Sequence, residues 1–293
     1  MKKDYEHIIN EIDVYKGNYY KNKKYKNQNR VIVFDLDETL GCFTEFDILW
    51  NTIQYIYGSS NPISHSQLLD IYPEFLRPNI IDILKYVYKK KKNGECQKLY
   101  IYTNNQSQSY SVNMIADYLS NKVARNTDVL FDQIIYAFKI NNQVVQIGRS
   151  THKKTHNDLI NCTLLPKKTA ICFLDDLEFD EMKKERIYYI QPKAYFHKMS
   201  LSAILKRLFS SKFQIVIKDN EYLIRDHFLT RCMKSNTLKK SSICNSREEE
   251  IVSKKIMYHI RDFFFLTQKR NKTQKNKKTT NKFTRKTYNK INL

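Results

Sequence analysis

The chain has 293 residues, of which 41% are hydrophobic, and a net charge of +21, which suits one good-sized domain with additions or two small domains. No stretch approaches the roughly 18 unbroken apolar residues of a membrane-spanning helix, and the first residues lack the apolar segment of a secretory signal, so we expect a soluble intracellular protein with no membrane partner. The five glycines form neither a dinucleotide-binding motif nor a P-loop, and no cysteine has the downstream arginine of a cysteine-based phosphatase, which excludes all three kinds of site.

The first half of the chain alternates between strand and helix patterns. Residues 1–29 are polar and rich in Tyr, Lys and Asn, and they predict a basic, partly helical extension. A run of branched and aromatic residues over 30–35 predicts a strand buried on both faces. Pro78 marks the start of a helix, which a second buried strand (98–103) and a helix over 104–120 follow.

The second half continues this alternation. Residues 129–147 predict a hairpin, because two alternating apolar runs flank a turn at Asn141 and Asn142. A further helix precedes a third buried strand over 170–175, and a fourth strand follows over 187–190. Strands that alternate with helices predict a three-layer α/β/α Rossmann-like fold with a mostly parallel sheet.

The pattern predicts that this domain spans residues 30–200, with two different segments after it. Residues 201–268 are expected to be mostly helical, because the apolar residues between 251 and 264 recur on one helical face. We expect that face to pack on the core rather than on a membrane surface. Residues 269–293 predict a disordered basic tail, since they contain ten Lys or Arg and no acidic residue.

The positive charge extends beyond this tail. Without the ten tail cations the chain would still carry a net charge of +11. Such a surplus attracts nucleic acid or another polyanion, so we keep nucleic acid as a partner of the tail, although charge alone carries no sequence specificity.

Polar residues stand where three of the predicted strands end. Asp35, Thr103 and Asp175 each close a buried strand, and Asp37 and Asp176 follow directly. In open α/β sheets, ligands bind outside the carboxyl ends of the strands. We therefore expect these side chains to converge on one site, although they lie far apart in the sequence.

Carboxylates in this arrangement suit phosphoryl transfer. Asp35 can act as a nucleophile, and Asp37 can protonate the leaving oxygen and later take a proton from water. Clustered carboxylates repel a phosphate, at a cost of about 4 kcal/mol for each pair about 4 Å apart. A Mg²⁺ ion held by Asp35 and Asp176 removes this repulsion, and a lysine and a hydroxyl complete the charge balance.

Four motifs in this order resemble the haloacid-dehalogenase (HAD) superfamily. The run D-L-D-E-T-L at 35–40 follows a buried strand, F-L-R-P at 75–78 precedes a helix, and Y-T-N at 102–104 and L-D-D at 174–176 end two further strands. More narrowly, they resemble the FCP/SCP-like (NIF-type) phosphatases of the RNA polymerase II C-terminal domain. The resemblance covers roughly residues 30–195. Large DNA viruses encode phosphatases of this kind, and the residue bias of this chain suits such a source.

The resemblance implies roles for the residues of the first two motifs. Asp35 is similar in position to the nucleophile, and Asp37 to the acid/base, whose backbone carbonyl also reaches the metal. Thr103 corresponds to the residue that hydrogen-bonds a phosphoryl oxygen, and Asn104 adjoins it as a substrate-binding residue.

The remaining motifs imply the metal ligands and a lysine. Asp176 would bind Mg²⁺ directly, with Asp175 either sharing that role or holding the ligands around it. For the lysine of the third motif we choose Lys154, with Lys153 next. Lys154 lies 21 residues before Asp175, farther than in the FCP/SCP-like enzymes, so the chain departs from the pattern there.

Structural alternatives compete with several of these roles. Thr103 could cap a helix, and Lys154 could be one more solvated lysine. His152 and His156, with Cys162 nearby, have the spacing of zinc ligands, but no second ligand pair follows, so we expect them merely to flank the lysine. The motif arginine, Arg77, has either a structural role or a role in attracting anions.

The segment 42–72 lies where this superfamily places its substrate-selecting cap. Here it is short, which leaves the site open and favours a macromolecular substrate; the resemblance implies phosphoserine or phosphothreonine in a protein. The alternatives are a polynucleotide-end phosphatase, or a non-catalytic module that binds nucleic acid or protein, against which the intact acidic motifs argue. The aromatic residues of the segment suit either cap or core: Phe43, Phe46, Trp50, Tyr55 and Tyr57.

Overall fold

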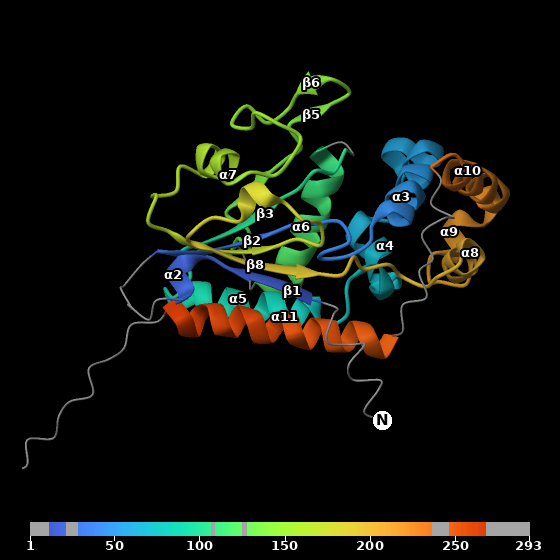
Figure 1. Ribbon diagram of the computed structural model, residues 1–293. Helices are drawn as coiled ribbons and strands as arrows, with labels where there is room; N and C mark the ends of the chain where they lie inside the picture. The colour runs from blue at the N-terminus through green and yellow to red at the C-terminus, as the bar shows by residue number, and fades with distance from the viewer. Residues whose placement is uncertain (1–11, 22–28, 107–108, 125–127, 236–245, 268–293) are drawn as a thin grey trace, which may run out of the picture.

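The protein forms a three-layer α/β/α structure around one central sheet (Figure 1). The computed structural model describes residues 12–21, 29–106, 109–124, 128–235 and 246–267. The basic tail expected after residue 268 lies outside the described residues. The mostly parallel sheet with helices on both faces confirms the fold class predicted from the sequence.

The sheet has six strands in the order β1-β8-β7-β2-β3-β4. All neighbours are parallel except β1, which runs antiparallel to β8. Every residue of the central strands β2 and β7 is buried, as expected of strands covered on both faces. The strands are β1 (Ile12–Lys16), β2 (Arg30–Phe34), β3 (Lys98–Tyr102), β4 (Gln133–Ile135), β7 (Ala170–Leu174) and β8 (Ile187–Pro192).

The N-terminal extension is more than the polar, partly helical segment predicted for it. It provides the edge strand β1 before a single helical turn, α2 (Asn18–Lys21). An edge strand has one partner and a half-exposed surface, so this short strand lacks the continuous apolar run by which a buried strand is recognised. Lys16 also forms an ion pair of 2.7 Å with Asp262, which joins this edge to the last described helix.

The predicted hairpin over 129–147 is shorter than expected. Its first part is β4, which pairs in parallel with β3 in the main sheet. The hairpin consists of β5 (Lys139–Ile140) and β6 (Gln143–Val144), and its turn lies at Asn141 and Asn142 as predicted. Both asparagines have positive φ angles, 49° and 63°, the backbone of a tight two-residue turn.

Helices cover both faces of the sheet. One face packs against α5 (Ile80–Lys92), α6 (Ser109–Val123) and α11 (Ser246–Thr267), and Figure 1 shows α5 and α11 side by side beneath the strands. The opposite face packs against α7 (His156–Thr163). The apolar stripe of α11 is buried on the core, as predicted, through Val252, Ile256, Ile260, Phe263 and Phe264.

The remaining helices form a lobe beside the sheet (Figure 1). They are α3 (Thr44–Tyr57), α4 (His65–Ile71), α8 (Leu201–Phe209), α9 (Gln214–Ile217) and α10 (Glu221–Lys234). The segment expected to form a small cap thus shares a core with helices from beyond residue 200. Within the described ranges, none of the helices combines the length and apolarity needed to cross a bilayer.

The aromatic residues of this segment divide between core and surface. Phe43, Phe46 and Trp50 are at most 4% exposed and belong to the core. Tyr55 is 75% exposed and stacks on His227 of α10, with ring centroids 4.7 Å apart. Helix α10, from beyond residue 200, therefore packs directly on α3.

Candidate active site

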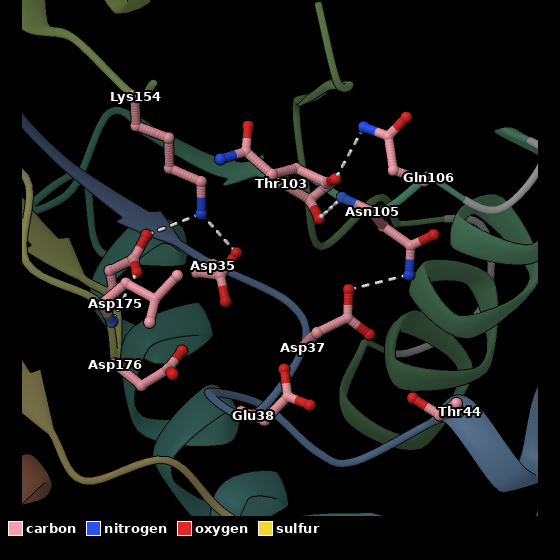
Figure 2. A pocket seen from close by; sticks show the side chains of 12 residues that line it. Asp35, Asp37, Glu38, Thr44, Thr103, Asn105, Gln106, Lys154, Asp175 and Asp176 are labelled. Atoms are coloured by element: carbon pink, nitrogen blue, oxygen red, sulfur yellow. Dashed lines mark hydrogen bonds and ion pairs between the residues drawn. The ribbon is translucent and has the colours of Figure 1, made fainter. Parts of the chain in front are cut away.

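The predicted site residues meet at the carboxyl edge of three neighbouring strands. Asp35 follows β2, Thr103 follows β3 and Asp175 follows β7, and the pairing of these strands aligns their ends. Together with Asp37 and Lys154 they line a pocket of about 330 Å³ (Figure 2). The convergence expected from the strand order is therefore present in the structure.

Lys154 lies at the centre of the buried charges. Its ammonium forms an ion pair with Asp35 and a second one, of 2.6 Å, with Asp175. Burial by itself would lower the pKa of Lys154, but the neighbouring carboxylates Asp175 and Asp35 outweigh it and leave the pKa raised. The lysine thus stays protonated, whereas its neighbour Lys153 is exposed and does not line the pocket.

Three carboxylates beside this lysine form a cluster that can hold a metal ion. Oxygens of Asp35, Asp175 and Asp176 lie within 4.8 Å of one another. Burial raises the pKa of Asp175 well above its usual value, and burial together with the charge of Asp35 raises that of Asp176 to about 6. Metal binding requires the carboxylates to be ionised; in that state, with Lys154 protonated, the cluster has a net charge of −2, which a hard divalent cation with oxygen ligands would neutralise.

Thr39 holds one of these carboxylates in place. Its hydroxyl donates to Asp176 Oδ1 at 3.0 Å and accepts the Asp176 backbone N–H at 3.1 Å. The side chain of Asp175 is fixed in a similar way, because Oδ1 accepts the Leu177 backbone N–H at 3.0 Å. Thr39 belongs to the first motif, and this role was not predicted from the sequence.

Asp37 lies on the other side of the pocket and outside the carboxylate cluster. Its Oδ2 accepts a hydrogen bond of 2.8 Å from the side-chain amide of Asn105. Burial and the nearby charge of Asp35 raise the pKa of Asp37 well above its usual value, despite the opposing effect of that hydrogen bond. The next residue, Glu38, has a positive φ of 55° and turns the chain away from the strand. Asp37 is therefore suited to carry a proton, and its partner Asn105 is a site residue that the motifs did not indicate.

Thr103 does not cap a helix in the described structure. It is fully buried, and its Oγ1 accepts the backbone N–H of Asn105 at 2.9 Å within a loop that precedes α6. The hydroxyl proton remains available to donate into the pocket. Asn104 lines the pocket as predicted, but its Oδ1 accepts a hydrogen bond of 2.7 Å from Arg149.

Arg149 ties together the segments around the pocket and was not identified from the sequence. Its guanidinium, 3% exposed, donates to the carbonyl oxygens of Thr103 at 3.0 Å and Tyr136 at 2.8 Å, and to that of Lys153 at 3.2 Å. It also stacks over the ring of Tyr102 at 4.8 Å. Because these partners are mostly backbone atoms, no motif around Arg149 could have indicated this function.

The structure decides between the two readings of Arg77. The side chain is 1% exposed and does not line the pocket. It donates to the carbonyl oxygens of Thr39 at 2.8 Å, Glu38 at 2.6 Å and Lys193 at 2.8 Å, and pairs with Glu249 of α11 at 3.0 Å. Arg77 therefore supports the loop after β2 rather than attracting anions at the surface.

His152, His156 and Cys162 fall outside the groups that could hold a metal ion in the described part of the chain. His152 instead packs against the ring of Phe138, with centroids 5.5 Å apart.

A second potential group of ligands consists of Cys42, Glu45 and His197. The backbone N–H of Met199 donates to His197 Nδ1 at 3.2 Å, so the ring proton lies on Nε2. That nitrogen faces Glu45 Oε2 at 3.2 Å and donates to it. A hydrogen bond between the side chains of His197 and Glu45 thus accounts for this contact without a metal ion.

Comparisons of the chain with protein-family models, with curated proteins and with solved structures found no match.

Proposed function

We propose that the protein is a Mg²⁺-dependent phosphomonoester hydrolase that forms an aspartyl-phosphate on Asp35. The observation that carries this proposal is the position of the Asp35 carboxylate between two different environments. On one side of Asp35 lie the Lys154 ammonium and the other two carboxylates of the cluster. On the other side lies Asp37, a carboxyl with a raised pKa (Figure 2). A nucleophile, a cation and a proton donor thus surround one pocket, as phosphoryl transfer requires.

In the first step, a carboxylate oxygen of Asp35 attacks the phosphorus atom and the bond from phosphorus to the ester oxygen breaks. Asp37 gives its proton to that ester oxygen, so the alcohol leaves as a neutral molecule. Lys154 and the hydroxyl of Thr103 donate to the phosphoryl oxygens and offset their negative charge.

In the second step, Asp37 is a carboxylate and takes a proton from a water molecule. The oxygen of that water attacks phosphorus, the bond between phosphorus and Asp35 breaks, and inorganic phosphate leaves. Asn105 keeps the Asp37 carboxyl oriented toward the reacting atoms in both steps. The cycle restores the ionised Asp35 and the protonated Asp37.

The donor set of the cluster fits the proposed metal ion. Asp35, Asp175 and Asp176 would hold Mg²⁺, with the backbone carbonyl of Asp37 as a further ligand implied by the motif resemblance. When bound, the ion would neutralise charge on the phosphoryl group. The all-oxygen donors and the net negative charge of the cluster support this assignment over a softer metal.

The proposed substrate is phosphoserine or phosphothreonine in a protein. The motifs resemble those of protein phosphatases, and the lobe beside the sheet leaves the pocket accessible at the surface. The aromatic residues of the cap segment are mostly core, so they do not close over the pocket as a lid for a small metabolite would.

The test is hydrolysis of p-nitrophenyl phosphate by the wild type and Asp35→Asn, each with Mg²⁺ and with EDTA. We expect turnover that requires both Mg²⁺ and Asp35. Asp82→Asn is the matched control, because that carboxylate is 70% exposed on α5, away from the pocket. Folded wild type without activity on this ester, on phosphopeptides or on 5′-phosphorylated oligonucleotides would contradict the proposal and favour a non-catalytic binding module. Turnover of the oligonucleotides alone would favour a polynucleotide-end phosphatase.

A further inference from the structure

A second hollow, of about 520 Å³, adjoins the catalytic pocket. The two share Asp37, Thr44, Asn105 and Gln106 in their walls, so they form one continuous depression. The second hollow lies between α3, α6 and the end of α10, and we call it the side groove. A substrate whose phosphate occupied the catalytic pocket would have a path for its neighbouring groups into this groove.

The walls of the side groove carry amides, an aromatic ring and one cation. Asn51 of α3 is exposed beside the shared Asn105 and Gln106, and Tyr110 of α6 is 58% exposed. Arg231 of α10 is the one cationic side chain among the described residues that line the groove. Arg231 is exposed, and no ion pair joins it to a carboxylate in the described ranges.

We propose that the side groove binds the peptide that flanks the phosphorylated residue, and that Arg231 pairs with an acidic or phosphorylated side chain of that peptide. The inference rests on the phosphatase function proposed above and specifies its substrate. Side-chain amides can both donate to and accept from peptide groups, which suits Asn51 and Gln106 to an extended peptide backbone. Arg231 offers the planar, bidentate donors that carboxylates and phosphates prefer.

The charges of the groove favour a peptide over a nucleic acid. A polynucleotide carries a negative charge at every phosphate and needs a series of cations along its path. Among the residues that the structure describes, Arg231 is the one cation lining the side groove, and the carboxylate of Asp47 also lines its wall. A chain with a mostly neutral backbone and one anionic side chain matches this distribution better.

Arg231 also has a purely structural explanation. It lies in the last turn of α10, where a cation stabilises the partial negative charge of the helix end. Loss of this interaction with the helix end would lower the stability of the protein without changing its preference among substrates. Arg225 provides a matched control, since it lies on the same helix, pairs with Glu221 at 3.3 Å and does not line the groove.

The experiment compares phosphoserine peptides in which a single glutamate is moved along an otherwise neutral sequence. For each peptide, kcat/KM is divided by kcat/KM for p-nitrophenyl phosphate measured on the same full-length variant. We expect the wild type to prefer peptides with the glutamate at particular positions by roughly three- to tenfold, mainly through a lower KM. We expect Arg231→Ala to lose this preference, Arg231→Lys to keep part of it, and Arg225→Ala to retain it.

The outcomes separate this inference from the proposed function. Wild type that hydrolyses none of the esters contradicts the phosphatase function itself. Wild type that hydrolyses p-nitrophenyl phosphate, with an Arg231→Ala variant that keeps the glutamate preference, overturns the inference alone. A 5′-phosphorylated oligonucleotide whose turnover depends on Arg231 more strongly than that of any peptide would also overturn it, in favour of a nucleic-acid substrate.

Discussion

The side-chain amide of Asn105 donates a hydrogen bond of 2.8 Å to Oδ2 of Asp37, and it does so across the ends of two neighbouring strands. In the proposed mechanism, the second carboxyl oxygen of Asp37 would carry the proton that the leaving alcohol takes up. The two residues are 68 positions apart in the sequence, so only the pairing of β2 with β3 brings them together.

Asn105→Ala is expected to lower kcat about tenfold to a hundredfold, because an unsupported Asp37 is a poorly placed general acid. The loss should be larger for phenyl phosphate and phosphoserine than for p-nitrophenyl phosphate, since nitrophenolate leaves without much help from a proton. Steady-state kinetics on the three esters measures this, with Asn121→Ala, an exposed position on α6, as the control. An equal loss on all three would show that Asn105 does not act through Asp37.

Lys154→Met is expected to lower both activity and stability. Removal of the ammonium leaves Asp35 and Asp175 buried next to each other, and loss of one partner of a buried ion pair costs roughly 3–5 kcal/mol. Mg²⁺ should recover part of this loss, because it would neutralise the same carboxylates. Thermal unfolding with Mg²⁺ and with EDTA measures both effects.

Lys153, the exposed neighbour of Lys154, provides the control for the Lys154→Met variant. Lys153→Met should unfold and react as the wild type does, because its side chain lies outside the pocket. A Lys154→Met variant that gains no more stability from Mg²⁺ than the wild type gains would argue against a metal ion at the carboxylate cluster.

Arg77→Met is expected to destabilise the protein by roughly 3 kcal/mol or more, because Glu249 would remain buried without this ion pair. The double variant Arg77→Met/Glu249→Leu should lose less stability than the two single variants lose together, as expected for residues in direct contact. Urea unfolding of the four proteins gives the coupling energy. Additive losses would show that the loop after β2 does not depend on this link to α11.

A structural feature could be predicted from the sequence where it depends on residues that are close together in the chain. The buried strands β2, β3 and β7 are recognisable because a strand covered on both faces is a continuous apolar run, and the carboxylates stand directly after those runs. Lys154 was likewise predicted from its local position, ahead of a helix and before a strand. In the structure its ammonium forms an ion pair with Asp35.

The features that the sequence did not predict depend on contacts between distant segments. Arg149 works through carbonyl oxygens, which every residue has, so its partners leave no pattern. The strand β1 is short and half-exposed, and only its pairing with β8 identifies it. The side groove exists because α10 packs on α3, which periodicity within either helix cannot indicate.

The stability of the lobe beside the sheet is expected to depend on pH because of His65. Its ring packs edge-on between Phe46 and Trp50, at centroid distances of 4.9 and 5.3 Å, and neither ring nitrogen has a hydrogen-bond partner in the described structure. Burial lowers the pKa of His65 from 6.5 to about 4. The unfolded chain therefore binds the proton first as the pH falls, so stability is complete above pH 6.5 and decreases toward about pH 4.

The expected loss over this interval is roughly 3 kcal/mol, from about 1.4 kcal/mol for each unit of pKa shift. His65→Phe and His65→Leu remove the titrating ring, and either one should flatten the profile between about pH 6.5 and 4. Two variants are needed because one of the two side chains can overpack the site and lower stability at every pH. Urea unfolding across this range measures how the free energy of unfolding changes with pH. Overpacking does not alter this pH dependence. If both variants keep the slope of the wild type, the proton that destabilises the protein binds elsewhere, and His65 is already accommodated in its charged form.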